Sequence, residues 1–246
     1  MPLPSHPNAD AVDPRMLERF LTVLQDARII PGVHHHCDEW CTYCPVTTRC
    51  LSFRCTAEWQ KHRRPERATS HLGEAVAFTR TLAAVEGLPT EELDAILANP
   101  DGGSGLETSD PLASMVWDYA VNAAIVMLPA AKPVADPVAT GESPRPEEVV
   151  LWYHLRLYFR IVRALIAKER HTAGAGGRLE DAIGSAKLAL VSIARSRQAL
   201  RSLGPSFDAA ATARLIAALD EIERVVDDRF PDARGFIRVG LDVPVS

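Results

Sequence analysis

The positions of apolar residues repeat along most of this chain with the period of an α-helix. The clearest example lies near the C-terminus, where apolar side chains recur at steps of four, three and four residues: Leu215, Leu219, Ile222 and Val226. This spacing places them on one face of a helix, where they can pack against a neighbouring element. No run of alternating apolar and polar residues has the pattern typical of a β-strand. The sequence therefore predicts an all-α protein.

Prolines, glycines and capping residues divide this pattern into separate helices. Asp110 followed by Pro111, for example, combines a capping carboxylate with a proline that suits the first helical turn. On such signals we expect helices over residues 14–30, 47–64, 70–86, 89–99, 111–128, 147–171, 178–203 and 209–230. Residues 129–146 contain five prolines and are expected to form a connection. The predicted fold class is an up-and-down helical bundle with an N-terminal cysteine-rich metal-binding loop.

The same signals divide the chain into five segments. In order, these are a tail with the first helix, a Cys/His metal-binding segment, the first helical part of the bundle, a proline-rich connection, and the second helical part with a C-terminal strap: 1–30, 31–68, 69–128, 129–147 and 148–246. No internal repeat is evident. A chain of 246 residues is long enough for one large domain or two small ones.

The composition is that of an ordinary soluble globular protein, with 47% hydrophobic and 24% charged residues. The chain starts without the apolar region of a signal peptide. Its most apolar stretch, residues 115–131, is too short to span a bilayer and is interrupted by Asp118 and Asn122. We therefore expect a cytoplasmic protein that does not associate with membranes. Thiols stay reduced in that compartment, so clustered cysteines there are more often metal ligands than disulfides.

All five cysteines lie within nineteen residues, which is the most distinctive feature of the sequence. They follow three consecutive histidines with the spacing Cys37-x3-Cys41-x2-Cys44-x5-Cys50-x4-Cys55. Thiolates are soft ligands that favour iron–sulfur clusters and zinc. A single compact loop of thiolates is closer to the way iron–sulfur ligands are presented than to the two separated pairs of a structural zinc site. The segment therefore predicts a [4Fe–4S] cluster, with zinc as the alternative.

Four thiols are the first-choice ligands: Cys37, Cys41, Cys44 and Cys50. Cys55 lies five residues beyond Cys50, which is about 140° around a helix, so the two would not naturally share one metal. If the helix begins later, Cys55 takes the place of Cys50 as the fourth ligand. For zinc, one of the preceding histidines is an alternative ligand: His34, His35 or His36.

Two local resemblances concern the same cysteines. Cys37-x3-Cys41-x2-Cys44, with Tyr43 before the last cysteine, resembles the signature of radical S-adenosylmethionine enzymes, which implies a [4Fe–4S] cluster on three thiolates. The helical continuation and the extra Cys50, which would close the open iron, argue against radical chemistry. The piece from Cys41 to Cys50 resembles the cysteine staple of some exonucleases, which also implies a [4Fe–4S] cluster. No nuclease motif accompanies it.

Charge bears on the choice of partner. The net charge of −5 gives the whole molecule no positive field that would attract nucleic acid. Basic residues do gather around and after the last cysteines, partly offset by Glu58 and Glu66: Arg49, Arg54, Lys61, Arg63, Arg64 and Arg67. A zinc-stapled regulatory module is therefore an alternative function, with a protein favoured over nucleic acid as its partner. A redox partner would suit a cluster, and apolar surface on the bundle is compatible with a homodimer.

A further alternative is an enzyme with a pocket in the helical bundle. His154 is predicted to point toward the apolar side of its helix, and a histidine that titrates near neutral pH is useful in a pocket. Three polar residues at four-residue steps could meet it across the bundle, although a solvent-exposed edge is the simpler interpretation: Ser114, Asp118 and Asn122. The sequence indicates no substrate and no reaction.

Overall fold

The computed structural model describes residues 14–62, 110–130, 143–174 and 178–243 of the chain, and the statements below concern these residues. They form helices and turns, with one isolated bridge between Val239 and Val243. The helices expected over residues 70–86 and 89–99 lie outside the described residues. Within the described ranges no helix is long and apolar enough to cross a membrane. The prediction of an all-α protein is confirmed for this part of the chain.

The chain divides into two compact units. The first comprises Met1–Pro31 and Val46–Gly105, and the second comprises Gly32–Pro45 and Leu106–Ser246. The boundary after Pro45 falls inside the predicted Cys/His segment, so the cysteines are distributed over both units. Each unit is described separately below.

The described part of the first unit contains two packed helices, α1 (Pro14–Leu24) and α2 (Leu51–His62). The 3₁₀ turn η2 (Thr47–Arg49) precedes α2, so the α-helix begins four residues later than the sequence indicates. Cys50 lies between the two elements and is buried, and its carbonyl oxygen accepts the first bond of α2 from the Arg54 N–H at 3.1 Å. Cys50 is therefore the residue at which the helix starts.

Helix α1 ends earlier than the apolar pattern predicts, at Leu24 rather than near residue 30. The carboxylate of Asp26 accepts the backbone N–H of Arg28 at 2.9 Å, which offers the chain a turn in place of further helical bonds. The same carboxylate pairs with the Arg28 guanidinium at 2.7 Å and with Arg54 of α2 at 2.5 Å. These contacts hold the pKa of Asp26 well below its usual range, chiefly because Arg28 donates to the ionised form.

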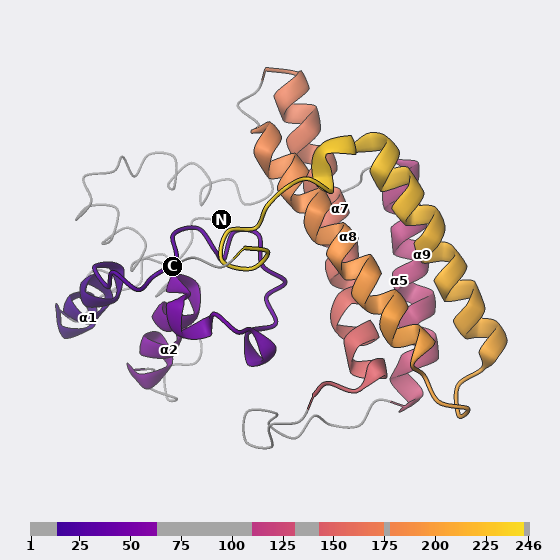
Figure 1. Cartoon of the computed structure of the whole chain (residues 1–246), viewed down its shortest axis with the longest axis horizontal. Helices are drawn as coiled ribbons and strands as arrows, with labels where there is room; N and C mark the ends of the chain where they lie inside the picture. Colours follow the sequence, from indigo (N-terminus) through magenta and orange to yellow (C-terminus); the bar gives the residue numbers. More distant parts are fainter. Residues whose placement is uncertain (1–13, 63–109, 131–142, 175–177, 244–246) are drawn as a thin grey trace, which may run out of the picture. The chain divides into compact units, whose positions relative to one another are not determined.

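The second unit contains a bundle of four helices, which run side by side in Figure 1: α5 (Pro111–Met127), α7 (Pro146–Thr172), α8 (Leu179–Arg201) and α9 (Ala209–Arg229). Each helix packs against the next one along the chain, and α9 closes the bundle by packing against α5. Two 3₁₀ turns, η4 (Leu128–Ala130) and η5 (Pro231–Ala233), follow α5 and α9. The predicted helical bundle is confirmed.

Small side chains allow α8 to approach its neighbours closely. The buried positions in its first half are mostly alanine, glycine and serine: Ala182, Gly184, Ser185, Ala186 and Ala189. Helices separated by such residues can interdigitate at short interaxial distances. On α9 the four apolar residues singled out by their spacing are all buried in the core of the bundle.

Side-chain caps set the starts of the helices. The Asp110 carboxylate accepts the backbone N–H of Leu112 at 2.8 Å, as the Asp-Pro pair predicts for the start of α5. At the start of α9, Asp208 accepts the N–H of Ala210 at 2.8 Å. At the start of α7, Glu148 reaches back to the N–H of Arg145 at 2.9 Å. These bonds satisfy amides that have no partner inside the helix.

Candidate functional site

Three of the five cysteines lie on the Gly32–Pro45 segment of the second unit: Cys37, Cys41 and Cys44. Cys50 and Cys55 belong to the first unit, at the start and in the first turns of α2. All five are present as thiols. Within the described residues no three Cys, His, Asp or Glu side chains form a group that could hold a metal ion. The four-thiolate site therefore stays a prediction, and the local geometry of each part can be examined on its own.

Cys41 and Cys44 flank a single 3₁₀ turn, η1 (Cys41–Tyr43). The Cys44 N–H donates to the Cys41 carbonyl at 3.2 Å, and the Tyr43 N–H donates to the Trp40 carbonyl at 3.0 Å. The Cys-x-x-Cys pair therefore spans one tight turn, with Cys41 in the 3₁₀ helix and Cys44 in an extended conformation directly after it.

Cys37 follows a turn at the start of the same segment. Gly32 has φ of 71°, a left-handed conformation that glycine adopts without strain, and its carbonyl accepts the His35 N–H at 2.9 Å. The Cys37 thiol is half-buried, and its sulfur lies 3.4 Å from the carbonyl oxygen of His34. The backbone therefore fixes the position of this thiol next to the bundle.

Asp38 is the main polar contact between this segment and the bundle. Its Oδ2 accepts a hydrogen bond from the Tyr153 hydroxyl at 2.8 Å and an ion-paired bond from Arg195 of α8. Its carbonyl oxygen accepts the Trp152 indole N–H at 3.2 Å. Burial, and then the charge of Asp38, raise the pKa of Tyr153, so this hydroxyl keeps its proton and donates. The carboxylate is thus held by two donors on two helices.

Glu39 has an unusual backbone conformation for a residue other than glycine, with φ of 60°. Such a conformation is retained only where the surroundings hold it in place. Arg160 supplies that restraint, because it donates to the Glu39 carboxylate at 2.5 Å and to the Cys37 carbonyl at 3.2 Å. Arg156 lies 3.9 Å from the same carboxylate. Arg160 therefore contacts the chain on both sides of Asp38, at the Cys37 carbonyl and at the Glu39 carboxylate.

Trp40 adds an aromatic contact immediately before the Cys-x-x-Cys turn. Its ring stacks on Trp152 of α7, with centroids 4.9 Å apart and an interplanar angle of 13°. Tyr153 meets the Trp40 ring edge-on at 5.8 Å, and the Arg156 guanidinium lies 3.6 Å from the centre of the Trp152 ring. Offset aromatic pairs and cation–π contacts both stabilise such an arrangement. The segment is therefore anchored on both sides of Cys37 and directly before Cys41.

Two of the three histidines are also packed against protein. His36 lies edge-on to Phe236 at 4.8 Å and against Gly184 of α8, where an added Cβ would lie 2.4 Å from its ring. The Nδ1 atoms of His34 and His36 are buried without a hydrogen-bond partner. Burial lowers the pKa of both rings, which favours the neutral form that binds metals. Their unsatisfied nitrogens are the one feature that suits zinc better than an all-thiolate cluster.

In the first unit, Cys50 and Cys55 differ in their surroundings. Cys50 is buried at the start of α2, and Cys55 is half-buried one turn further on. Burial raises the pKa of the Cys55 thiol, which favours the protonated form over the thiolate that a metal needs. Helix α2 begins later than the spacing predicts, which is the condition that favours Cys55, whereas burial disfavours its thiolate, so the choice between Cys50 and Cys55 stays a prediction.

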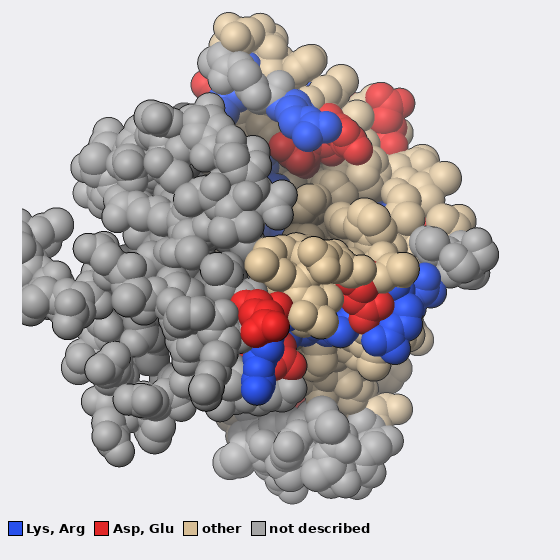
Figure 2. Space-filling model, turned by 90° about the vertical axis from the view of Figure 1, so that its left-hand side faces the viewer, with Lys and Arg blue, Asp and Glu red and all other residues tan. Residues whose placement is uncertain are grey.

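The basic residues after the cysteines are partly neutralised where the structure describes them. Arg54 pairs with Asp26, and the Arg49 guanidinium donates to the Arg28 carbonyl at 3.1 Å. The side chains of Lys61, Arg63, Arg64 and Arg67 lie outside the described residues. On the face shown in Figure 2, Lys and Arg lie beside Asp and Glu. The described surface seen there therefore carries no large field of one sign that would attract nucleic acid.

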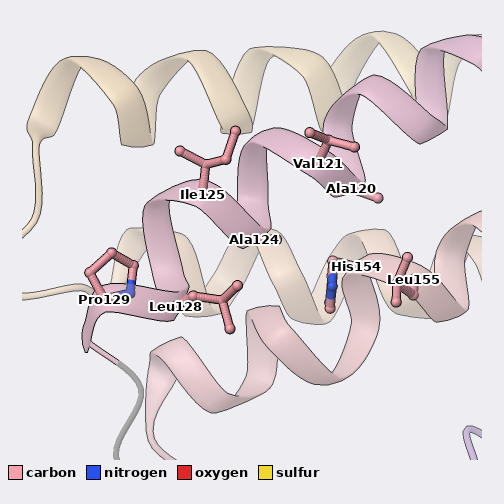
Figure 3. A pocket seen from close by; sticks show the side chains of 8 residues that line it. All are labelled: Ala120, Val121, Ala124, Ile125, Leu128, Pro129, His154 and Leu155. Carbon is pink, nitrogen blue, oxygen red and sulfur yellow. The ribbon is translucent and has the colours of Figure 1, made fainter.

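A groove with a volume of about 610 Å³ lies between α5 and α7. Figure 3 shows that its lining comes from α5, η4 and α7: Ala120, Val121, Ala124, Ile125, Leu128, Pro129, His154 and Leu155. His154 is the single ionisable residue in this lining, and burial lowers its pKa. Its Nδ1 lies 2.5 Å from the Leu151 carbonyl oxygen. The predicted apolar setting of His154 is therefore present.

Asp118 does not line this groove. It is exposed on α5, as are Ser114 and Asn122, so the simpler interpretation of that polar stripe as a solvent edge is correct. The groove is therefore lined by one histidine and by apolar side chains, and no second titratable group lies beside His154 in this lining. An acid–base pair of the kind that most hydrolytic or proton-transfer enzymes use is not assembled there.

Comparison with known proteins adds no family to this description. No protein-family model matches the chain, and neither curated proteins nor solved structures give a match.

Proposed function

We propose that the protein binds a [4Fe–4S] cluster through Cys37, Cys41, Cys44 and Cys50, and uses it for redox chemistry, sensing or structural stapling. The observation that carries this proposal is the Cys-x-x-Cys turn between Cys41 and Cys44. This turn brings the two cysteines close in the chain, on a segment that Asp38 and Trp40 hold against the bundle. A bound cluster supplies reversible one-electron chemistry.

The residues around the thiols suit this role. Metal ligands need positions set in advance by their neighbours, and here the anchors lie within one or two residues of Cys37 and Cys41. Arg156, Arg160 and Arg195 also bring positive charge to the segment, which would offset the negative charge of a thiolate-ligated cluster. Cys50 is proposed as the fourth ligand on its spacing, with Cys55 as the alternative.

The test is purification without oxygen, followed by visible absorption and by iron and sulfide analysis. We expect a brown protein with a broad band near ~400 nm and about four irons per chain. Replacing any of the four ligands by serine should remove most of the iron. Cys55→Ser is the matched control and should leave the spectrum unchanged. A colourless protein without iron or sulfide would contradict the proposal, and loss of iron in Cys55→Ser but not in Cys50→Ser would reassign the fourth ligand.

A zinc site is the second candidate, and the unsatisfied Nδ1 atoms of His34 and His36 favour it. Zinc accepts mixed thiolate and imidazole ligands in a tetrahedral arrangement. The protein would then be a stapled module that binds a regulatory partner. This candidate predicts a colourless protein with about one zinc per chain. His34→Ala or His36→Ala should lower its zinc content, whereas neither substitution should remove iron from a four-thiolate cluster.

A further inference from the structure

The outward side of α5 and α7 carries exposed apolar side chains in place of the usual polar ones. Six of them are 39–65% exposed and form a surface that we call the α5–α7 face: Trp117, Val121, Ile125, Leu128, Leu155 and Phe159. The four residues from α5 and η4 follow one another at steps of four, four and three, which places them on a single stripe. Contiguous exposed apolar surface of this kind marks interaction sites.

Charged residues are rare on the α5 part of this surface, whereas on α7 the exposed Arg163 follows Leu155 and Phe159 on the same stripe. Asp118 is the only Lys, Arg, Asp or Glu in the whole of α5. A partner recognised by charge, such as nucleic acid or an acidic peptide, would find no complementary groups on this helix. His154 in the adjoining groove is favoured in its neutral form because burial lowers its pKa. The partner that fits is therefore itself apolar and neutral at the point of contact.

The face also contains both a ridge and a groove. Ala120 and Ala124 line the groove together with Ile125 and Leu128, which are 65% and 60% exposed and project as one wall, the ridge. A two-fold interface requires that one patch be complementary to itself, so that a projection on one copy meets a depression on the other. A ridge lying next to a groove of helical spacing meets that requirement through ridges-into-grooves packing.

The exposed area is close to what a stable dimer needs. Residues of this size expose roughly 150–250 Å² each when free, so the six exposed fractions amount to on the order of 600 Å². A standard interface buries about 800 Å² on each partner, and its core is rich in aromatic side chains. The six residues alone supply roughly three quarters of that area.

We propose that the α5–α7 face is the interface of a homodimer, in which the ridge of each copy packs into the groove of the other about a two-fold axis. The inference rests on the exposed apolar area, the scarcity of charge on α5 and the projecting wall of the groove. It is independent of whether the cysteines bind iron or zinc.

The test is the mass of the full chain in solution by sedimentation equilibrium over a range of concentrations. We expect the wild-type protein to approach twice the 26.9 kDa of one chain. Ile125→Asp should weaken self-association on the order of 100-fold, because each dimer would bury two unpaired carboxylates. Leu128→Glu should have a similar effect, and it provides a second variant if the first fails to fold.

The matched control is Ala213→Asp, which adds the same charge at an exposed position of α9. This variant should dimerise like the wild type. A wild-type chain that stays monomeric at high concentration would overturn the proposal, whatever covers the face. A dimer that persists in both Ile125→Asp and Leu128→Glu would place the interface elsewhere and would overturn it equally.

Discussion

Two neighbouring strips along helix α7, here called its covered side and its bare side, carry different kinds of side chain. One side carries Trp152, Arg156 and Arg160, and the Gly32–Pro45 segment covers it. The bare side is the strip next to it, and it carries Leu155 and Phe159, which are 40% and 54% exposed. The covered side is aromatic and charged, whereas the bare side is apolar.

The difference shows how each side selects its partner. On the covered side nearly every contact joins a particular donor to a particular acceptor, as between Tyr153 and Asp38, so only this segment in this register satisfies it. On the bare side the interaction is non-directional and scales with area. Directional hydrogen bonds and ion pairs therefore hold a segment of the same chain on the covered side. The exposed apolar side chains of the bare side can pack against a surface of matching shape. The predictions below test the covered side first and the bare side last.

The largest effect should come from Asp38→Ala. This change removes the acceptor of the Tyr153 hydroxyl and leaves Arg195 without its carboxylate, while the side chain that is lost is only 13% exposed. We expect the free energy of unfolding of the second unit to fall by about 3 kcal/mol. Hydrogen exchange in Gly32–Pro45 should become faster at the same time, because the segment loses its main polar anchor. Urea denaturation and exchange mass spectrometry measure the two effects.

Two control variants sharpen this result. Asp38→Asn keeps an oxygen acceptor but loses the charge, so it should cost about half as much. Asp232→Ala removes an exposed carboxylate from η5 and should change the stability by less than about 0.5 kcal/mol. Unchanged hydrogen exchange in Asp38→Ala would show that other contacts hold the segment. The claim that specific polar pairs fix the segment to the covered side of α7 would then be wrong.

The aromatic contact on the covered side should contribute somewhat less. Trp40→Ala removes the ring stacked on Trp152 and the edge contact with Tyr153, and we expect a loss of about 2 kcal/mol. Trp40→Phe keeps a ring that can stack and should recover at least half of that loss. Thermal unfolding followed by far-UV circular dichroism gives both values. Equal losses in the two variants would mean that the indole acts through something other than stacking.

The sequence predicts the bundle far better than it predicts this covered side. The buried stripe of α9 and the cap at Asp110 follow from spacings of three or four residues, which are visible in any short window. The contacts of Asp38 with Tyr153 and Arg195 join residues separated by 115 and 157 positions. No local pattern reports them, because each residue alone is an ordinary polar side chain.

Local patterns also mislead where a side chain competes with the backbone. The apolar spacing extends the first helix to residue 30, but the Asp26 carboxylate takes the Arg28 amide and ends α1 at Leu24. The spacing of the cysteines indicates which thiols suit one metal, whereas their actual approach depends on how the chain packs. The cysteine ligand set therefore stays a prediction that metal analysis must test.

A smaller effect is expected where the segment meets α8. Gly184 has a helical conformation, so alanine there should stabilise the helix by about 1 kcal/mol if space allowed it. The added Cβ would lie 2.4 Å from the ring of His36, which must move. We expect Gly184→Ala to destabilise the protein by about 1 kcal/mol in the wild-type background and to stabilise it by a similar amount in His36→Ala. A double-mutant cycle measured by urea denaturation decides between these signs, and the same sign in both backgrounds would show that His36 does not pack on α8.

The smallest effect concerns His154, the titratable residue of the groove on the bare side. Burial lowers its pKa in the folded protein, whereas in the unfolded chain the pKa keeps its ordinary value of 6.5. Between these two pKa values the unfolded chain binds a proton that the folded protein does not, so the free energy of unfolding falls as the pH decreases through that window. Well above pH 6.5 the ring is neutral in both states and contributes no pH dependence.

His154→Leu should therefore gain stability relative to the wild type as the pH is lowered from about 7.5 to 5, by less than about 1 kcal/mol in total. Gln198→Leu is the control, because it places a leucine at an exposed position of α8 without removing a titratable group. Its stability difference from the wild type should not depend on pH. Urea denaturation at a fixed protein concentration and several pH values gives both difference curves. A His154→Leu curve as flat as the control would mean that the groove admits water freely to the ring. The surroundings of His154 would then be aqueous, unlike the apolar side chains that line the rest of the groove.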